Sequence, residues 1–219
     1  MSKKLLMNNY SENGLMPVME GLICWLDDRD DREGNRINDR VGLNDFLLEG
    51  DFGDKPYHLS NKHKFFSEKA FSLANQFSIS MTVNISSIGS YGCLLIRESA
   101  KGSPYSTFKI GNRNNNKIGF YSSMAGAVNK GVDILLNRVI NFTIVFKNDS
   151  IYFYDYEKVA DSPISKFSFS HPIQIGSYEY SATDRSNFML HSVKIYNRAL
   201  TEKEIQQNYL YEQSIERGW

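Results

Sequence analysis

The chain has 219 residues, of which 41% are hydrophobic and 13% aromatic, enough for a packed core. That length fits one large β-sandwich or two small domains, and the sequence contains no repeat, low-complexity run or clear linker that would favour two. The 25 basic and 25 acidic side chains cancel, so the net charge gives no reason to expect nucleic acid or an anionic membrane as a partner.

Residues 1–20 are polar and irregular, with turn markers at Asn13-Gly14 and at Pro17. Their apolar run, residues 5–7, is too short for the core of a signal peptide, and no stretch of the chain reaches the ~18 apolar residues of a membrane span. We therefore expect a protein made in a cytoplasm without an export signal. Residues 1–20 are expected to form an arm that tethers a partner or crosses the domain.

Short apolar runs after the arm predict strands separated by charged or glycine-rich loops. Residues 22–26 are predicted to form a buried strand, and residues 27–39 a charged loop in which arginines alternate with acids. Residues 43–48 and 57–59 are short strand candidates on either side of a glycine-rich turn.

Residues 77–85 have the clearest strand pattern in the sequence, because apolar and polar side chains alternate without a break. The apolar face is expected in the core; it carries Phe77, Ile79, Met81, Val83 and Ile85. The opposite face is polar; it carries Ser78, Ser80, Thr82 and Asn84. A more continuously apolar strand is predicted at residues 91–97.

Two hairpins are predicted in the middle of the chain. Residues 107–111 pair with 117–121 across an asparagine-rich run. Residues 139–147 pair with 150–156 across Asn148-Asp149, residue types that tolerate the left-handed backbone of a tight hairpin turn.

The last part of the chain is predicted to be a strand that leads directly into a helix. Residues 188–196 are aromatic and β-branched, and they follow shorter strand candidates at 166–170 and 172–176. Thr201 and Glu204 are spaced as a capping box, and Leu200 and Ile205 as a hydrophobic staple. Many short strands and one terminal helix indicate an all-β sandwich.

The same closing segment resembles a known family. Residues 193–205 and Tyr209 resemble the closing motif of laminin-G-like domains in the concanavalin A-like lectin and glucanase superfamily; they read Val-Lys-Ile-Tyr-Asn-Arg-Ala-Leu-Thr-Glu-Lys-Glu-Ile and then Tyr. Residues 21–27 and 38–45 resemble the opening of that family. The resemblance implies a concanavalin A-like jelly-roll sandwich of two antiparallel sheets with a short C-terminal helix, and it gives a domain at residues 21–219.

The acidic loop offers oxygen ligands of the kind that calcium prefers, with Asp28, Asp30 and Asp31 as candidates. The loop does not follow the EF-hand pattern, and its interleaved arginines favour solvated ion pairs instead. The resemblance also argues against a metal site, because relatives carry acidic residues just before the closing motif, where this chain has His191 and Ser192. We expect no cofactor, with calcium as the alternative.

Catalysis is not expected. The glucanase branch of the superfamily uses a strand-borne E-x-D-x-x-E motif with paired carboxylates. The nearest string here contains Glu49, Asp51 and Asp54, and its glycines predict a loop rather than a strand. The four histidines are scattered without zinc-ligand spacing. We predict that the chain is not an enzyme, with a degenerate glycoside hydrolase as a remaining alternative.

Tyrosines on the strand at 150–156 are candidates for carbohydrate binding. Tyr152, Tyr154 and Tyr156 share one face, where their rings can stack on sugars while their hydroxyls form hydrogen bonds. The alternative is that these tyrosines are half in the core, because a two-layer sandwich covers both faces of some strands.

One late loop and the amide-rich run at residues 112–116 supply further candidates, since amides, carboxylates and aromatics often hold sugars in lectin-like sandwiches. These candidates are Tyr178, Tyr180, Asp184, Arg185, Asn112 and Asn114. Cys24 and Cys93 lie in apolar runs and are predicted to be buried thiols, with a disulfide as the alternative.

These observations predict a non-catalytic domain that binds carbohydrate or another protein's surface. Laminin-G-like domains are usually extracellular and this chain has no export signal, so we expect a bacteriophage virion protein of the tail, baseplate or head surface that contacts host cell-surface carbohydrate. The alternative is an assembly or decoration protein that binds only other virion proteins. A homo-oligomer is compatible with either.

Overall fold

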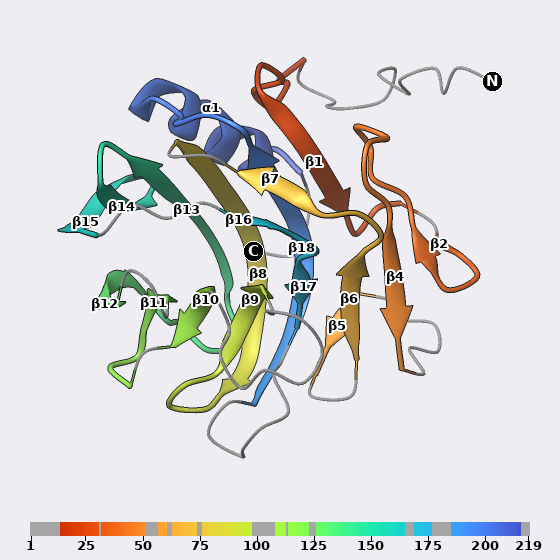
Figure 1. Ribbon diagram of the computed structural model, residues 1–219, viewed down its shortest axis with the longest axis horizontal. Coiled ribbons are helices and arrows are strands. Elements are labelled where there is room, and N and C mark those ends of the chain that lie inside the picture. The colour runs from red at the N-terminus through yellow and green to blue at the C-terminus, as the bar shows by residue number, and fades with distance from the viewer. Residues whose placement is uncertain are drawn as a thin grey trace.

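The computed structural model describes residues 14–30, 32–50, 57–60, 63–73, 76–97, 108–112, 114–122, 126–164, 169–176 and 185–215. Within these residues the chain forms two large antiparallel sheets, a two-stranded ribbon and one helix (Figure 1). The predicted all-β sandwich with a short C-terminal helix is therefore confirmed.

One sheet has seven strands within the described residues. They are β1 (Leu22–Asp27), β5 (His58–Leu59), β8 (Phe77–Ile88), β13 (Val139–Lys147), β14 (Ser150–Asp155), β15 (Glu157–Pro163) and β18 (Ser186–Tyr196). Their order is β1-β18-β8-β13-β14-β15, with β5 also paired to β18. This order makes β15 one edge of the sheet.

The second sheet has nine strands within the described residues. They are β2 (Arg32–Glu33), β3 (Arg36–Ile37), β4 (Phe46–Glu49), β6 (Lys64–Ser67), β9 (Cys93–Arg97), β10 (Phe108–Asn112), β11 (Lys117–Ser122), β12 (Gly126–Asp133) and β17 (Gln174–Ile175). Their order is β12-β11-β10-β9-β17-β6-β4-β3-β2, so β12 is an edge. A separate ribbon pairs β7 (Phe71–Leu73) with β16 (Phe169–His171).

The core lies between the two sheets. The predicted apolar face of residues 77–85 is fully buried there, as are Phe142 and Ile144 of β13. Phe120 of the nine-stranded sheet packs edge-on against Phe146 of the seven-stranded sheet, with ring centroids 5.1 Å apart. Each such aromatic or aliphatic side chain contributes about 1.5–3 kcal/mol when it is removed from water.

The helix α1 (Glu202–Gln213) begins where the sequence predicts. The Thr201 side chain accepts a hydrogen bond from the Glu204 backbone, and the Glu204 carboxylate accepts one from the Thr201 backbone, which completes the capping box. The staple residues Leu200 and Ile205 are both buried in a second apolar cluster. No helix in the described residues is long and apolar enough to cross a membrane.

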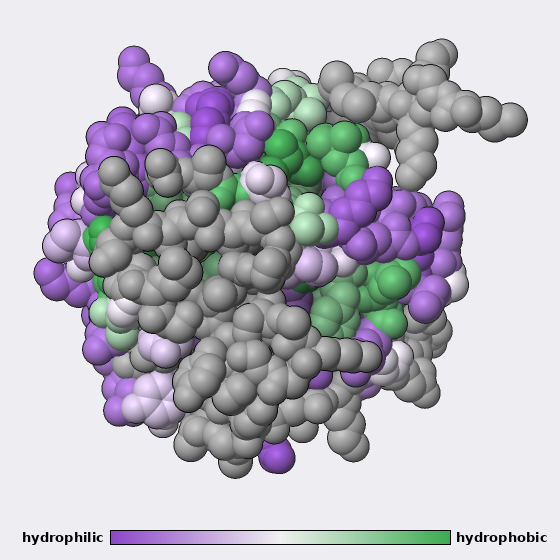
Figure 2. All heavy atoms as spheres, in the orientation of Figure 1, coloured by the Kyte–Doolittle hydropathy of each residue, from purple (hydrophilic) through white to green (hydrophobic). Residues whose placement is uncertain are grey.

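The polar face of β8 is buried from Ser78 to Thr82 as well, because α1 packs over the outer face of the seven-stranded sheet there. Ser78 accepts a hydrogen bond from the Leu200 backbone, and Thr82 donates one to the Glu212 carboxylate of α1. The outward face of the helix region is hydrophilic in Figure 2, at the upper left. The alternation of apolar and polar side chains in residues 77–85 was predicted, and so was the helix, but not that the helix covers the polar side. This helix adds a third layer to the sandwich locally.

The described part of the N-terminal arm lies against the helix. The Val18 amide donates to the Asn208 side chain, the Tyr196 hydroxyl donates to the Val18 carbonyl, and Gln207 donates to the Met16 carbonyl. Residues 1–13 lie outside the described residues.

Both predicted hairpins are confirmed. β10 pairs with β11, and β13 pairs with β14 through a turn in which Asn148 and Asp149 have φ of 52° and 55°. Two left-handed residues in succession match the twist of a hairpin. Cys24 and Cys93 are buried free thiols, and burial raises the pKa of Cys24.

Six of the described strands were not predicted: β2, β3, β6, β7, β12 and β15. β6 and β7 are only four and three residues long. β12 and β15 lack an alternating pattern because both are irregular edge strands. The predicted loop at residues 27–39 also contains the short strands β2 and β3.

Candidate functional site

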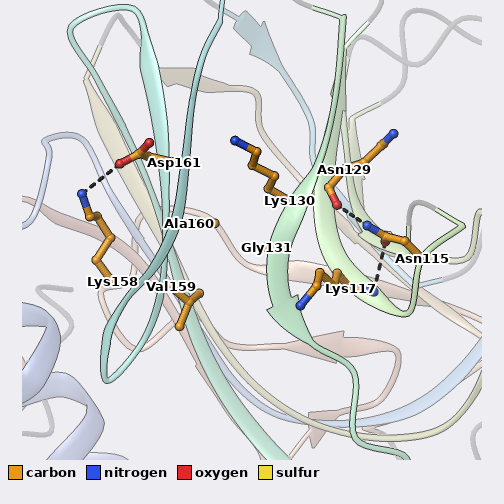
Figure 3. Close-up of a pocket in the computed structure, with 9 residues that line it drawn as sticks. All are labelled: Asn115, Lys117, Asn129, Lys130, Gly131, Lys158, Val159, Ala160 and Asp161. Atoms are coloured by element: carbon orange, nitrogen blue, oxygen red, sulfur yellow. Dashed lines mark hydrogen bonds and ion pairs between the residues drawn. The ribbon is translucent and has the colours of Figure 1, made fainter.

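An open groove lies where the edges of the two sheets meet, between β12 and β15 (Figure 3). Its volume is about 480 Å³, within the range typical of small-molecule sites. The lining residues come from β11 and the turn before it, from β12 and from β15. They are Asn115, Lys117, Asn129, Lys130, Gly131, Lys158, Val159, Ala160 and Asp161.

A β-bulge shapes the β12 wall of the groove. Ile118 is opposite Val132 and Phe120 is opposite Val128, so three residues of β12, 129–131, face the single residue Gly119. Asn129 and Lys130 are consecutive and both exposed. In a regular strand successive side chains point to opposite faces of the sheet, so one of the two would point toward the core. The bulge is therefore what turns these two polar residues to the surface beside the groove.

Gly131 lets the bulge close against β11. A Cβ atom at this position would stand 1.7 Å from the Ile118 carbonyl oxygen and 3.3 Å from the Phe153 ring in the other sheet. Any larger residue would push β12 away from both neighbours. The absence of a side chain here lets the two sheets approach at the floor of the groove.

The opposite wall is bulged too. Phe153 is opposite Ala160 and Tyr154 is opposite Lys158, so Val159 is an extra residue in β15. Val159 is 49% exposed and provides an apolar surface among polar neighbours. Both edge strands that border the groove are therefore bulged, and bulges are often found beside functional sites.

The charges of the groove are partly neutralised by ion pairs. The Lys158 amine lies 2.8 Å from the Asp161 carboxylate, and Lys117 pairs with Asp133. The hydrogen bond from Lys158 lowers the pKa of Asp161, and the nearby charge of Lys130 contributes in the same direction. Among the described residues, none forms an ion pair with Lys130 itself, which extends between the two walls in Figure 3.

This set of groups is suited to binding a polar ring with one apolar face. Asparagine amides and lysine amines donate hydrogen bonds, Asp161 accepts them, and Val159 offers apolar contact. A saccharide presents hydroxyl groups at its edge and C–H groups on its faces, so it matches this combination.

The predicted tyrosines lie near this groove but not in its lining. Tyr154 is buried in the cluster under α1, and Tyr152 is half-buried with the Lys158 amine 5.9 Å from its ring. Tyr156 has φ of 60° and is 37% exposed, and its ring meets Tyr209 at a centroid distance of 5.1 Å. Tyr152 and Tyr154 do share one face of β14, but that face packs toward α1, and Tyr156 lies in the turn beyond β14.

Three of the predicted loop residues meet at one end of the sandwich. The Asn112 side chain donates a hydrogen bond to the Gly89 carbonyl. The backbone N–H of Asn114 donates one to the Ser90 carbonyl, and the backbone N–H of Gly89 donates one to the Arg185 carbonyl. Asn112 is buried, whereas Asn114 and Arg185 are exposed. The remaining candidates of these loops lie outside the described residues; they are Tyr178, Tyr180 and Asp184.

The calcium candidates are engaged by basic side chains. Asp28 lies 2.6 Å from the His191 ring, and Asp30 forms two hydrogen bonds with Arg40. Within the described residues, no group of three or more histidine, cysteine, aspartate or glutamate side chains is arranged to hold a metal ion. Asp31 lies outside the described residues.

The carboxylate string considered for catalysis is only partly described. Glu49 is exposed at the end of β4, and Asp51 and Asp54 lie outside the described residues. Glu49 is therefore in a strand rather than in the predicted loop.

Comparison with known proteins assigns the family. A family model described as the concanavalin A-like lectin/glucanases superfamily matches residues 60–206, more than half of the chain. The chain belongs to this superfamily. The resemblance read from the closing motif is confirmed, and the groove is a feature of this member of the superfamily. No curated protein sequence matches the chain significantly.

Solved structures share the fold at low identity. Trypanosoma rangeli sialidase in complex with sialic acid matches with a TM-score of 0.67 and 16% identity, over 94% of this chain and 37% of the sialidase chain. A structure of botulinum neurotoxin type C, described as dependent on two ganglioside molecules for cell entry, matches with a TM-score of 0.66 and 18% identity, over 90% of this chain and 52% of that one. This chain thus corresponds to about a third of the sialidase chain and half of the neurotoxin chain, and the likeness shows the fold alone.

One sequence-based prediction is corrected by these structures. The chain was predicted not to be an enzyme, yet chains that share its fold over 94% of its length include a sialidase, which is an enzyme. This fold therefore gives no ground for predicting that the chain lacks catalytic activity, because one fold can support several functions.

The sequence did not predict most of the residues that line the groove. Asn115 lies in the asparagine-rich run already noted, but the lysines of β11, β12 and β15 were not considered. The signal that was available is Asn-Lys-Gly at residues 129–131, since a glycine inside a strand often marks a bulge or a close backbone approach.

Proposed function

We propose that this domain binds carbohydrate in the groove between β12 and β15. The observation that carries the proposal is the pair of facing bulges, which place amides, amines, a carboxylate and the apolar Val159 around one hollow. Hydrogen bonds from the polar groups would orient the sugar hydroxyls, and contact with Val159 would cover C–H groups of the ring.

The fold comparison supports the same class of ligand. The sialidase structure contains sialic acid, which is a sugar, and the neurotoxin structure concerns ganglioside molecules, which are lipids that carry sugars. These ligands belong to those proteins; for this chain the groove itself supplies the argument.

The substitution Val159→Asp tests the proposal. It removes the apolar wall at an exposed position, so we expect the affinity for a bound saccharide to fall at least tenfold, about 1.4 kcal/mol, with little change in stability. A glycan array identifies the saccharide, and isothermal titration calorimetry measures its Kd with the wild type and the variant.

The matched control is Leu47→Asp, which makes a similar change at an exposed position of β4 on the far side of the nine-stranded sheet. Binding by this control should equal that of the wild type. The proposal fails if the folded wild type binds no saccharide, or if both variants bind as the wild type does.

The sequence suggests a setting for this activity. The proposed ligand is a host cell-surface carbohydrate and the proposed location is a bacteriophage virion, supported by the resemblance of the closing motif to domains of virion proteins. Mass spectrometry of purified particles should then detect the chain, and the purified protein should bind host cell walls. Detection in particles without binding to walls would favour the assembly role instead.

A further inference from the structure

Lys130 is the unbalanced charge of the groove. Two of the three lysines in the lining pair with aspartates, Lys117 with Asp133 and Lys158 with Asp161. Lys130 is exposed, and within the described residues it forms no ion pair, although its charge also acts on the Asp161 carboxylate across the groove. The electrostatic potential is therefore expected to be most positive on the β12 side of the groove.

The backbone around Lys130 is held in place on both sides. The Asn115 side chain donates a hydrogen bond to the Asn129 carbonyl, while its own oxygen accepts one from the Lys117 amide at 3.2 Å. On the other side, Gly131 packs directly against the Ile118 carbonyl. A charge at the tip of a fixed bulge is preorganised for a ligand, which reduces the entropy lost on binding.

The opposite wall is close to neutral, because Asp161 on β15 is paired with Lys158. The Asp161 carboxylate can accept hydrogen bonds, but this wall gives an anion no net attraction. A ligand with one charged end and several hydroxyl groups would therefore lie with its anionic group toward β12 and its hydroxyls toward Asp161.

We propose that the groove selects acidic saccharides, with the Lys130 amine receiving the carboxylate, phosphate or sulfate group of the sugar. This inference rests on the proposed carbohydrate binding and adds the class of ligand. It makes Lys130 a specificity-determining residue, whereas Val159 contributes to the affinity for any ring.

The experiment compares matched pairs of sugars. A glycan array presents saccharides that carry uronic acid, sialic acid, phosphate or sulfate, each beside its neutral parent, and calorimetry then measures the Kd of the best pair. We expect the acidic member to bind at least tenfold more tightly in low salt, and the ratio to shrink as the salt concentration rises. Comparing the acidic groups identifies which anion is preferred.

Lys130→Met and Lys130→Arg separate charge from shape. The methionine variant should bind the acidic and the neutral member of the pair equally, whereas the arginine variant should keep the preference. Lys69→Met is the matched control, because Lys69 is an exposed lysine between β6 and β7, across the nine-stranded sheet from β12.

Three results would overturn the inference. Equal binding of acidic and neutral sugars by the wild type removes the selectivity but leaves the proposed function. A preference that persists in Lys130→Met assigns the selectivity to another group. Absence of binding by any saccharide on the array overturns the proposed function together with the inference.

Discussion

Lys194 and Glu212 form an ion pair from which water is excluded, since their side chains are 1% and 0% exposed. The Glu212 carboxylate also accepts hydrogen bonds from Ser192 and Thr82, at 2.9 and 3.1 Å. The Lys194 amine lies 5.4 Å from the Trp25 ring. Glu212 thus joins α1 to β18 and β8, and Lys194 extends these contacts to Trp25 of β1.

The substitution Lys194→Met should destabilise the protein by about 3–5 kcal/mol, because it leaves the Glu212 charge buried without its cation. Guanidinium denaturation of the wild type and the variant measures the free energy of unfolding. Lys203→Met, an exposed position on the same helix, should change it by less than about 0.5 kcal/mol. A loss below about 1 kcal/mol for Lys194→Met would contradict the role given to the pair.

Glu204 links the helix cap to pH. The hydrogen bonds from Arg198 lower the pKa of this carboxyl group from its usual 4.5 to about 2, and hydrogen bonds from Thr201 add to the effect. The pKa is lower in the folded state, so the stabilisation is complete above pH 4.5 and is lost as the pH falls toward 2.

The variant Glu204→Gln should therefore lose about 1–2 kcal/mol at pH 7, a modest amount because the ion pair is partly exposed to solvent. Its stability should approach that of the wild type between pH 4.5 and pH 2. Urea denaturation at several pH values gives both curves, and Glu202→Gln in the same helical turn serves as the control. Parallel curves would show that Glu204 is not the titrating group.

At the scale of elements, the bulged strand β12 depends on one glycine. Gly131 lies so close to the Ile118 carbonyl that a methyl group cannot be placed without moving one strand. β12 and β11 pair regularly on both sides of this point, at Val132 and at Val128. A change at Gly131 must therefore distort the pairing or the groove.

We expect Gly131→Ala to reduce the stability by about 1–3 kcal/mol, the usual cost of overpacking a close contact. Saccharide affinity should fall as well, because the bulge that presents Lys130 would shift. Gly126→Ala is the comparison at the start of the same strand, where a Cβ atom meets nothing within 4 Å; its φ of 81° adds backbone strain but no contact. If Gly131→Ala matched the wild type in stability and affinity, the close approach would not be essential.

Individual elements differ in how well the sequence predicts them. β8 and α1 were predicted because alternation and the Thr201 capping box are local signals. β12 and β15 were missed because each interrupts the two-residue period with extra residues, and strand prediction depends on that period. Tyr154 was a binding candidate because nothing in its local sequence shows that it is buried. Its burial depends on a helix that begins 48 residues later in the chain.

For the whole molecule, the family and the layered fold could be predicted, whereas the groove could not. The closing motif identified the superfamily, and the apolar pattern identified the sandwich. The groove brings residues 129–131 of one sheet beside residues 158–161 of the other, and that proximity follows from the packing of the sheets. The loop residues Asn112, Asn114 and Arg185 were candidates from two separate loops of the sequence, and the structure places all three around the turn at Gly89 and Ser90.

The two bulges also bear on how copies of this protein behave at high concentration. A straight sheet edge offers a row of free backbone groups on which another chain can add a strand, the first step of aggregation. β12 and β15 are both edges, and each is interrupted by a bulge and carries charged side chains, while β15 ends in Pro163. The irregularities that shape the groove therefore also keep these edges from pairing with other molecules, so a substitution that straightened either strand would lower solubility along with affinity.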